Sequence, residues 1–324
     1  MINWGIIGCG DVTEVKSGPA FSKIPGSKLV AVMRRDAAKA QDYARRHYVA
    51  RWYSSVDDIL NDKEVNAIYV ATPPLWHEKL AIAALESGRP VYLEKPMAIN
   101  SNGAEKIVMT ANRQGRKLTV AHYRREIALF KKVKQLIDEG VIGRVLNVQL
   151  KFHQPFDSNL FAGTEGNWRL NKELSGGGLF HDLAPHQLDL MLYFFGKPIS
   201  AAGKANNESG LYDLPDVIDA SIKFEHNVGF EGSWKFTAPL EDKQDTVEIT
   251  GANGKLSFAC FDHSRLILES NEQMEVLKFL PDLHVQEPMI RKVVQYFSGE
   301  IENPCSGEDG VTVMEMIDRI TGNL

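Results

Sequence analysis

The residues best suited to chemistry lie in the stretch "SGGGLFHDLAPHQLDL", residues 175–190. Three glycines precede Asp182, and His186 follows four residues later. An imidazole titrates near neutral pH, so it can remove the proton of a substrate hydroxyl or return it. Helical positions four apart face the same way, so the carboxylate and the imidazole can meet one ligand. Glycines without side chains would let this helix begin close against a bound molecule.

A second reactive group is Lys95 in "VYLEKPMAIN", residues 91–100. Glu94 and Lys95 end a short apolar run that predicts a buried strand, and Pro96 allows a cis bond after the lysine. Partial burial disfavours a charged ammonium unless it has a partner. Lys95 is therefore suited to hold a substrate hydroxyl or to ease its deprotonation.

The segment "ATPPLWH", residues 71–77, ends the preceding predicted strand. Thr72, Pro73 and Pro74 predict a rigid wall beside which a nicotinamide ring would lie. His77 begins the next predicted helix, and a lone histidine there favours a structural contact over catalysis.

A dinucleotide site is indicated by "GIIGCGDVT", residues 5–13, after the first predicted strand. Gly8 would permit a tight turn, and Gly10 would let the backbone approach a pyrophosphate at the next helix N-terminus. Thr13 replaces the small third residue of the usual fingerprint, and Gly18-Pro19 predicts an early end to the first helix. The expected cofactor contacts of this turn are Gly8, Gly10, Asp11 and Val12. Thr72, Pro73, Pro74, His77, Glu94 and Lys95, which follow the neighbouring strands, are expected to contact the cofactor as well.

The cofactor preference is indicated by "AVMRRD", residues 31–36. Arg34 lies where chains that bind NAD usually place a carboxylate for the ribose. Arg34 and Arg35 suit a 2′-phosphate, because guanidinium groups bind phosphate bidentately. This predicts NADP(H) over NAD(H). In the alternative, both arginines are solvated and Asp36 holds the ribose.

The elements that must position these residues alternate through the first part of the chain. Short apolar runs predict buried strands, and amphipathic stretches between them predict helices. The alternation indicates an α/β fold with a doubly wound parallel Rossmann sheet, whose ligands bind at the carboxyl ends of the strands. The predicted strands are 3–8, 28–33, 65–71, 90–94 and 117–122, and the predicted helices are 36–47, 75–88 and 100–115.

The pattern changes after residue 122. A helix is predicted over 126–139, followed by long alternating runs with turns at 226–227 and 251–254. These runs (145–152, 217–236, 245–260 and 265–270) indicate a large open, mostly antiparallel sheet with the helix after the glycines on one face. The predicted domains are therefore 1–122 and 123–324, and a last helix over about 308–321 could pack on either.

The glycine turn, "ATPP…H", "EKP" and "SGGGLFHDLAPHQLDL" together resemble the glucose-fructose oxidoreductase / inositol dehydrogenase / MocA family over nearly the whole chain. The resemblance implies that Lys95, Asp182 and His186 form the catalytic group. It also implies oxidation or reduction of sugars, cyclitols or related polyols with a nicotinamide cofactor. The open sheet would be the interface of a homodimer or homotetramer. Ala184 and Pro185 depart from the family's usual residues between Asp182 and His186.

Further residues suit recognition of a polyhydroxylated ring. Tyr123 and Arg124 lie at the junction of the predicted domains, Trp168 and Arg169 lie shortly before the glycines, and these four are the expected substrate contacts together with Asp182. His153 on a predicted strand is a weaker candidate, because a structural position is equally consistent with it.

Three alternatives concern the opening stretch. Asp182 could be only the N-cap of a helix with Pro185 in its first turn. Asp189 could support His186 or serve packing. His181 and His186 are not spaced four apart as a helical pair of metal ligands, and no further strong ligand is evident beside Asp182. No metal is therefore expected.

Composition narrows the class of protein. The net charge of −5 argues against nucleic acid as a partner. Cys9, Cys260 and Cys305 form no CxxC pair, which fits a reducing cytoplasm. The sequence shows neither a signal peptide nor an apolar run long enough to span a membrane. Two other functions remain open: a non-catalytic protein that binds NADP or a sugar and regulates a partner, and a dehydrogenase of a non-sugar diol.

Overall fold

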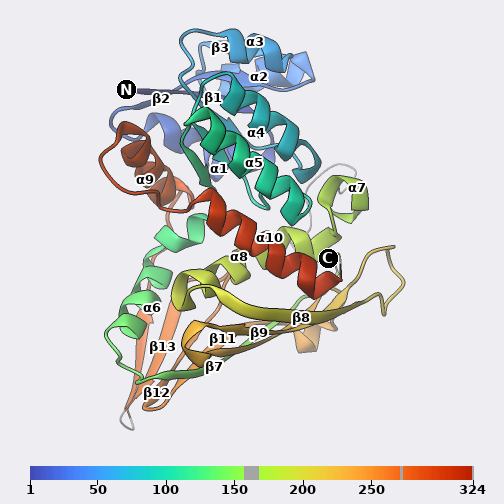
Figure 1. The fold of residues 1–324 in the computed structure, drawn as a ribbon, viewed down its shortest axis with the longest axis vertical. Coiled ribbons are helices and arrows are strands. Elements are labelled where there is room, and N and C mark those ends of the chain that lie inside the picture. Colours follow the sequence, from blue (N-terminus) through green and yellow to red (C-terminus); the bar gives the residue numbers. More distant parts are fainter. Residues whose placement is uncertain (157–167, 271–272, 323–324) are drawn as a thin grey trace. The chain divides into compact units, whose positions relative to one another are not determined.

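The computed structural model describes residues 1–156, 168–270 and 273–322. The chain divides into two compact units (Figure 1). The first unit contains Met1–Tyr123 and Asp282–Val311, and the second contains Arg124–Pro281 and Thr312–Leu324.

The first unit is built on a six-stranded parallel sheet of order β3-β2-β1-β4-β5-β6. The predicted Rossmann class is confirmed. The strand order reverses between β1 and β4, which is where such sheets bind their ligands. The strands are β1 (Ile2–Ile7), β2 (Ser27–Met33), β3 (Arg51–Tyr53), β4 (Ala67–Val70), β5 (Val91–Leu93) and β6 (Leu118–Val120).

Helices flank this sheet, and α4 and α5 pack side by side. The buried strands supply the core, in which the rings of Tyr69 and Tyr92 stack at 5.1 Å. The helices are α1 (Asp11–Val15), α2 (Ala37–Arg46), α3 (Val56–Asn61), α4 (His77–Glu86), α5 (Ser101–Gln114) and α9 (Glu287–Ser298).

Local signals explain where these helices begin and end. Asp36 caps α2 by accepting the N–H of Lys39 at 3.1 Å. The first helix, α1, has only five residues, and a 3-10 turn, η1 (Gly18–Ser22), follows it. A side chain at Gly18 would lie 2.2 Å from the Tyr43 hydroxyl oxygen, so only glycine fits at this predicted break.

The second unit is built on an eight-stranded sheet of order β14-β13-β12-β11-β7-β10-β9-β8. All neighbours are antiparallel except β7 and β10, so the predicted mostly antiparallel sheet is confirmed. The strands are β7 (Val145–His153), β8 (Pro198–Asn206), β9 (Val217–Phe224), β10 (Gly229–Lys235), β11 (Gln244–Gly251), β12 (Gly254–Phe258), β13 (Arg265–Ser270) and β14 (Gln273–Lys278).

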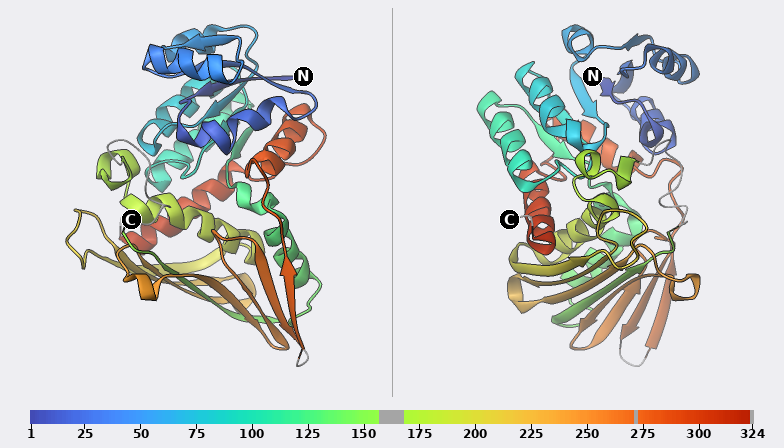
Figure 2. Two further views of the ribbon diagram at one scale, coloured as in Figure 1. Left: turned by 180° about the vertical axis from the view of Figure 1, so that it is seen from behind. Right: turned by 90° about the vertical axis from the view of Figure 1, so that its right-hand side faces the viewer.

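One face of this sheet is covered by helices, as Figures 1 and 2 show. α8 (Gly178–Phe195) lies on it, with Phe180 packed against Trp234 at 5.1 Å and Phe195 against Phe224 at 6.0 Å. α6 (Ala128–Asp138) packs beside α8. Residues along β9 are alternately buried and exposed, so the opposite face of the sheet carries exposed side chains.

The end of the chain differs from the predicted division at residue 123. Residues 282–311, including α9, belong to the first unit, and the last helix, α10 (Gly307–Thr321), spans the division. A side chain at Gly310 would lie 2.6 Å from the sulfur of Met97, whereas Ile320 lies against Gly203 of β8. The N-terminal part of α10 therefore packs within the first unit and its C-terminal part within the second, which periodicity alone does not reveal.

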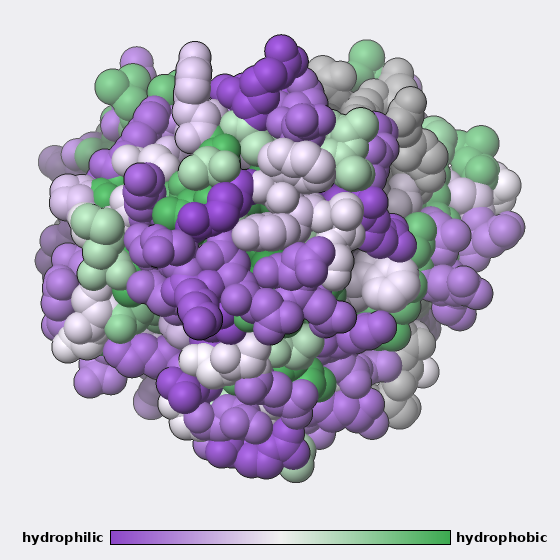
Figure 3. Space-filling model, turned by 90° about the horizontal axis from the view of Figure 1, so that it is seen from above, coloured by the Kyte–Doolittle hydropathy of each residue, from purple (hydrophilic) through white to green (hydrophobic). Residues whose placement is uncertain are grey.

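Figure 3 shows one face of the molecule, on which hydrophilic side chains predominate. Hydrophobic side chains form only small groups on this face. Among the described residues, no helix combines the length and the apolarity needed to cross a bilayer.

Candidate functional site

The turn after β1 has the geometry that a dinucleotide needs. Gly8 has a φ of +96°, and a side chain there would lie 2.7 Å from Cγ2 of Thr72. Gly10 precedes α1 with extended backbone, and the space that its side chain would occupy is open to 4.0 Å. Asp11 and Val12 are the first residues of α1. The glycines thus let β1 and β4 end close together and leave room for a phosphate beside the backbone.

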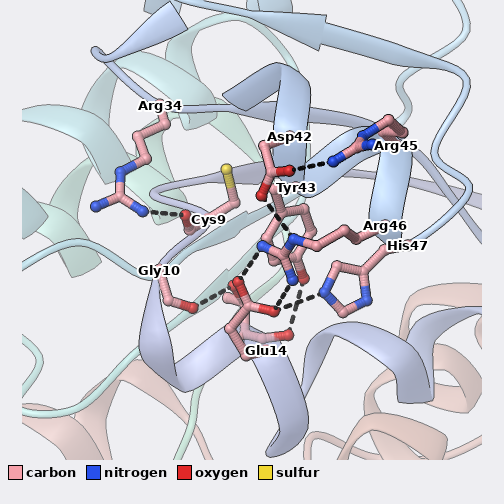
Figure 4. Close-up of polar contacts among 10 residues, drawn as sticks. Cys9, Gly10, Glu14, Arg34, Asp42, Tyr43, Arg45, Arg46 and His47 are labelled. Atoms are coloured by element: carbon pink, nitrogen blue, oxygen red, sulfur yellow. Dashed lines mark hydrogen bonds and ion pairs between the residues drawn. The ribbon is translucent and has the colours of Figure 1, made fainter. Parts of the chain in front are cut away.

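Thr13 compensates for its departure from the usual fingerprint. It is fully buried, and its hydroxyl donates to the Gly10 carbonyl oxygen at 2.7 Å. The Tyr43 hydroxyl donates to the Thr13 carbonyl oxygen at 2.8 Å (Figure 4). In the usual fingerprint a smaller residue at this position lets the helix pack closely. Here these hydrogen bonds hold the turn in place instead.

A network of ion pairs joins α1 to α2 in the same view (Figure 4). Both carboxylate oxygens of Glu14 accept from Arg46 at 2.7 Å, and Asp42 accepts from Nε of Arg46 at 2.6 Å. The hydrogen bonds from Arg46 hold the pKa of Glu14 below its usual value. Arg46 is therefore engaged by protein carboxylates and is a poor candidate for binding phosphate.

Arg34 and Arg35 are placed differently. Arg34 donates from Nη1 to the Cys9 carbonyl oxygen at 3.2 Å, so its guanidinium lies beside the glycine turn (Figure 4). The exposed Arg35 guanidinium lies 5.2 Å from the centroid of the Trp76 ring. The carboxylate of Asp36 caps α2, which weakens the alternative in which it holds the ribose.

Glu94 and Lys95 follow β5, as predicted, and the Lys95-Pro96 peptide bond is cis. The Glu94 carboxylate is turned into the unit: the Tyr69 hydroxyl, Nε2 of Gln286 and the backbone N–H of Lys95 donate to it. Only 5% of Glu94 is exposed. Its predicted contact with the cofactor could therefore come only from its backbone, while its carboxylate anchors the base of the Lys95 loop.

His77 connects two walls of the predicted site. Its Nδ1 lies 2.8 Å from the Pro96 carbonyl oxygen and its Nε2 lies 2.7 Å from the Thr72 carbonyl oxygen. A protonated ring would donate to both oxygens and a neutral ring to one. Burial outweighs these carbonyls and lowers the pKa of His77 to about 4, which favours the neutral ring at neutral pH. These contacts agree with the interpretation of His77 as a structural rather than a catalytic residue.

In the second unit, the start of α8 excludes the alternative in which Asp182 is only an N-cap with Pro185 in the first turn. The helix begins at Gly178, with Gly177 as its N-cap, so Asp182 lies in the second turn and is not a cap. Pro185 lies inside the helix rather than in its first turn. The helix begins early because Gly178 donates its N–H to Oγ of Ser175 at 2.8 Å. The glycines were expected to precede the helix, but the last of them begins it.

The glycines of this segment also admit neighbouring side chains. A side chain at Gly177 would lie 2.0 Å from Nδ1 of His181, and one at Gly178 would lie 2.9 Å from Leu214. Burial lowers the pKa of His181 to about 4, so its ring is neutral. No group of three or more potential metal ligands is assembled within the described residues.

Asp182 forms a cluster with two of the predicted substrate residues, Trp168 and Arg169. Arg169, on the 3-10 helix η4 (Trp168–Leu170), donates from Nε to Oδ2 of Asp182 at 2.6 Å. The Arg169 guanidinium also lies 4.7 Å from the centroid of the Trp168 ring. This fixes the carboxylate and balances its charge, so Asp182 is suited to accept a hydroxyl hydrogen bond rather than to act as a base.

Asp189 pairs with Arg125 of the 3-10 helix η3 (Tyr123–Glu126). Nη2 of Arg125 donates to Oδ1 of Asp189 at 2.7 Å, and Nε lies 3.0 Å from both oxygens. Their side chains are 8% and 1% exposed. This geometry favours the packing alternative for Asp189, because its carboxylate is held by a buried guanidinium.

Replacing Arg125 with methionine should lower the free energy of unfolding by about 3–5 kcal/mol, because Asp189 would keep its buried charge and lose the guanidinium. Chemical denaturation measures this. Arg113, whose pair with Glu86 is exposed, is the control, and Arg113→Met should cost less than about 1 kcal/mol. Equal small losses in the two variants would contradict the importance of the buried pair.

Sequence reasoning missed the surroundings of His186. This histidine is 5% exposed, and its ring lies 5.9 Å from that of Phe261 at 82°. Arg124, predicted to bind substrate, is 5% exposed; it donates to the Cys260 carbonyl oxygen at 2.6 Å and covers the Phe261 ring at 4.5 Å. Its guanidinium therefore supports a loop. The loop between β12 and β13 has no periodic signal that would have identified Phe261.

The two remaining candidates, Tyr123 and His153, lie mostly among protein atoms. Tyr123 is 6% exposed at the start of η3. His153 ends β7, with Nε2 3.2 Å from Oγ of Ser233, and burial lowers its pKa. Both positions suit packing at least as well as contact with a ligand.

The chain matches two family models. A model described as an oxidoreductase family with a NAD-binding Rossmann fold matches residues 2–122, and a model of the GFO/IDH/MocA C-terminal domain matches residues 130–257. The oxidoreductase P35 of Formosa agariphila is 44% identical over 321 residues, which cover 99% of this chain and 98% of that protein. The 1,5-anhydro-D-fructose reductase of Ensifer adhaerens is 26% identical over 258 residues, 79% of this chain and 75% of that protein.

Solved structures have the same fold. Levoglucosan dehydrogenase in complex with NADH matches with a TM-score of 0.87 at 20% identity, over 98% of this chain and 95% of that chain. At this identity the likeness concerns the fold alone.

Proposed function

Since the chain belongs to the GFO/IDH/MocA oxidoreductase family, we propose that it transfers a hydride between NADP(H) and a carbinol or carbonyl carbon of a sugar, cyclitol or related polyol. The proposal rests on two sets of side chains that the structure holds in place. Lys95 follows β5 on a loop held by Glu94 and His77, and Asp182 shares one face of α8 with His186.

Each residue has a defined task in this proposal. When bound, a nicotinamide cofactor would supply the hydride acceptor for oxidation or the hydride donor for reduction. The Lys95 ammonium donates a hydrogen bond to the reacting oxygen and stabilises developing negative charge on it. His186 takes up the hydroxyl proton in oxidation and returns it in reduction. Asp182, held by Arg169, accepts a hydrogen bond from a neighbouring hydroxyl and orients the ring.

The names of relatives support a sugar-like substrate. A reductase of 1,5-anhydro-D-fructose is among the curated relatives, and levoglucosan dehydrogenase is among the structures of the same fold. Stacking on the Trp168 ring next to a charged Arg169–Asp182 pair suits a molecule with an apolar ring face and hydroxyl edges.

The proposal is tested by measuring nicotinamide absorbance with NADP+ or NADPH and a panel of sugars, anhydrosugars, cyclitols and their keto forms. We expect turnover with at least one of them. Aromatic diols belong in the panel: turnover restricted to these would replace the polyol assignment. Tight cofactor binding without turnover of any panel member would favour the non-catalytic regulatory function.

The preference for NADP(H) rests on Arg34 and Arg35. Arg34 lies at the glycine turn, and Arg35 covers Trp76, so both guanidinium groups adjoin the end of β2, where the ribose of a bound dinucleotide would lie. Replacing Arg34 with alanine should raise KM for NADP+ about 10- to 100-fold and change KM for NAD+ by less than about threefold, because only NADP+ carries the 2′-phosphate.

Arg45→Ala is the matched control, since Arg45 is an exposed arginine of α2 that pairs with Asp42. It should leave both KM values unchanged. Equal effects of Arg34→Ala on the two cofactors, or a native preference for NAD+, would contradict the proposal.

The proposed assembly is a homodimer or homotetramer formed through the exposed face of the eight-stranded sheet. Light scattering coupled to size exclusion would measure its mass.

A further inference from the structure

The loop between β12 and β13 reaches the candidate catalytic histidine. Phe261 presents its ring to His186 at 5.9 Å and 82°, an edge-to-face arrangement. The Phe261 ring also lies 4.8 Å from that of Phe152 on β7. All of these residues belong to the second unit.

Asp245 of β11 holds the backbone of this loop. Its carboxylate accepts three consecutive backbone N–H groups, from Cys260 at 3.0 Å, Phe261 at 2.7 Å and Asp262 at 3.3 Å. Burial of Asp245 is the largest effect on its carboxyl and raises its pKa. Asp245 is half-buried, and its carboxylate is satisfied by these three backbone donors, so the loop has a preferred conformation.

Arg124 holds the loop from a second direction. Its Nη1 donates to the Cys260 carbonyl oxygen at 2.6 Å, and its guanidinium lies 4.5 Å from the centroid of the Phe261 ring. The Phe261 ring is thus fixed by Asp245 through its own backbone and by Arg124 across its face. This rigidity would favour the reaction, because the group that accepts the proton must keep one orientation toward the reacting oxygen.

We propose that Phe261, held in place by Asp245 and Arg124, is a positioning residue that fixes the ring plane of His186 for proton transfer. The inference rests on the proposed function, in which His186 exchanges the proton. The charged groups near this arrangement are Asp182 and Asp189 of α8 and Arg125, which pairs with Asp189. Arg124 of η3 and Asp245 of β11 contact the loop from other elements.

The test compares Phe261→Leu, which removes the ring, with Phe261→Tyr, which keeps it. Phe261→Leu should lower kcat about 10- to 100-fold and leave the Kd for NADP+ unchanged, because only the orientation of the imidazole is lost. Phe261→Tyr should stay within about threefold of the native kcat. Phe224→Leu, an aromatic deletion at a ring contact of Phe195 in the same unit, is the control for general loss of packing.

Asp245→Asn tests the anchor. It should lower kcat as Phe261→Leu does, and the double variant should be no worse than the more impaired single variant, because both changes remove one positioning device. Nuclear Overhauser contacts between the rings of residues 186 and 261 supply a readout that needs no turnover. They should be present in the native protein and weakened in Asp245→Asn.

These outcomes separate the two proposals. Absence of turnover with any substrate, with the ring contacts present and dependent on Asp245, would overturn the proposed function and with it the catalytic use of Phe261. An active enzyme whose kcat falls equally in Phe261→Leu and Phe224→Leu, or does not fall in Phe261→Leu, would overturn the positioning role alone.

Discussion

Replacing Lys95 with methionine should lower kcat about 10²- to 10⁴-fold and leave the Kd for NADP+ within about threefold, because the ammonium acts on the reacting oxygen. Methionine keeps an unbranched side chain and loses the charge. The loop backbone should remain in place, since Glu94 accepts the backbone N–H at position 95 and His77 contacts the Pro96 carbonyl oxygen. Steady-state kinetics and fluorescence titration of the cofactor measure the two effects.

The matched control is Lys79→Met on α4, an exposed lysine of the same unit. It should leave kcat unchanged. A Lys95→Met variant with native kcat would remove Lys95 from the reaction, and one that loses cofactor binding and kcat together would assign it to the cofactor instead.

Replacing His186 with asparagine should also lower kcat about 10²- to 10⁴-fold, because the amide can form hydrogen bonds but does not exchange protons near neutral pH. The pH–rate profile of the native enzyme should show a limb that reports the exchange of this proton. That limb should be absent from the residual activity of the variant. Rates measured from pH 5 to 10 check both expectations.

His226→Asn is the control for this change. His226 is an exposed turn residue with a φ of +59°, and asparagine tolerates that conformation better than most residues. Its kcat and pH profile should match those of the native enzyme. A His186→Asn variant that keeps the native limb would show that another group exchanges the proton.

The sequence was most informative where one signal decides the local structure. Buried apolar runs indicated five of the strands of the first sheet, and the turns at 226–227 and 251–254 join β9 to β10 and β11 to β12 as predicted. The short β3 was not predicted, because Arg51–Tyr53 has too few residues to show alternation. β14 was missed because nearly all of its residues are exposed on an edge strand.

The site could be predicted only as far as local motifs reach. The glycine turn and the strand-end lysine follow from short segments, and the structure places both at the ends of parallel strands. The structural use of Arg124 and the partners of Glu94 depend on residues 136 and 192 positions away, Cys260 and Gln286. The start of α8 was misplaced because three consecutive glycines rarely begin a helix.

The proposed mechanism requires Lys95 and His186 to act on the same substrate oxygen. A crystal structure of the protein with NADP+ and a polyol that it oxidises tests this most directly. We expect Nζ of Lys95 and a ring nitrogen of His186 both to lie within hydrogen-bond distance of the oxygen on the carbon that faces the nicotinamide. A bound polyol whose reacting oxygen contacts neither group would contradict it.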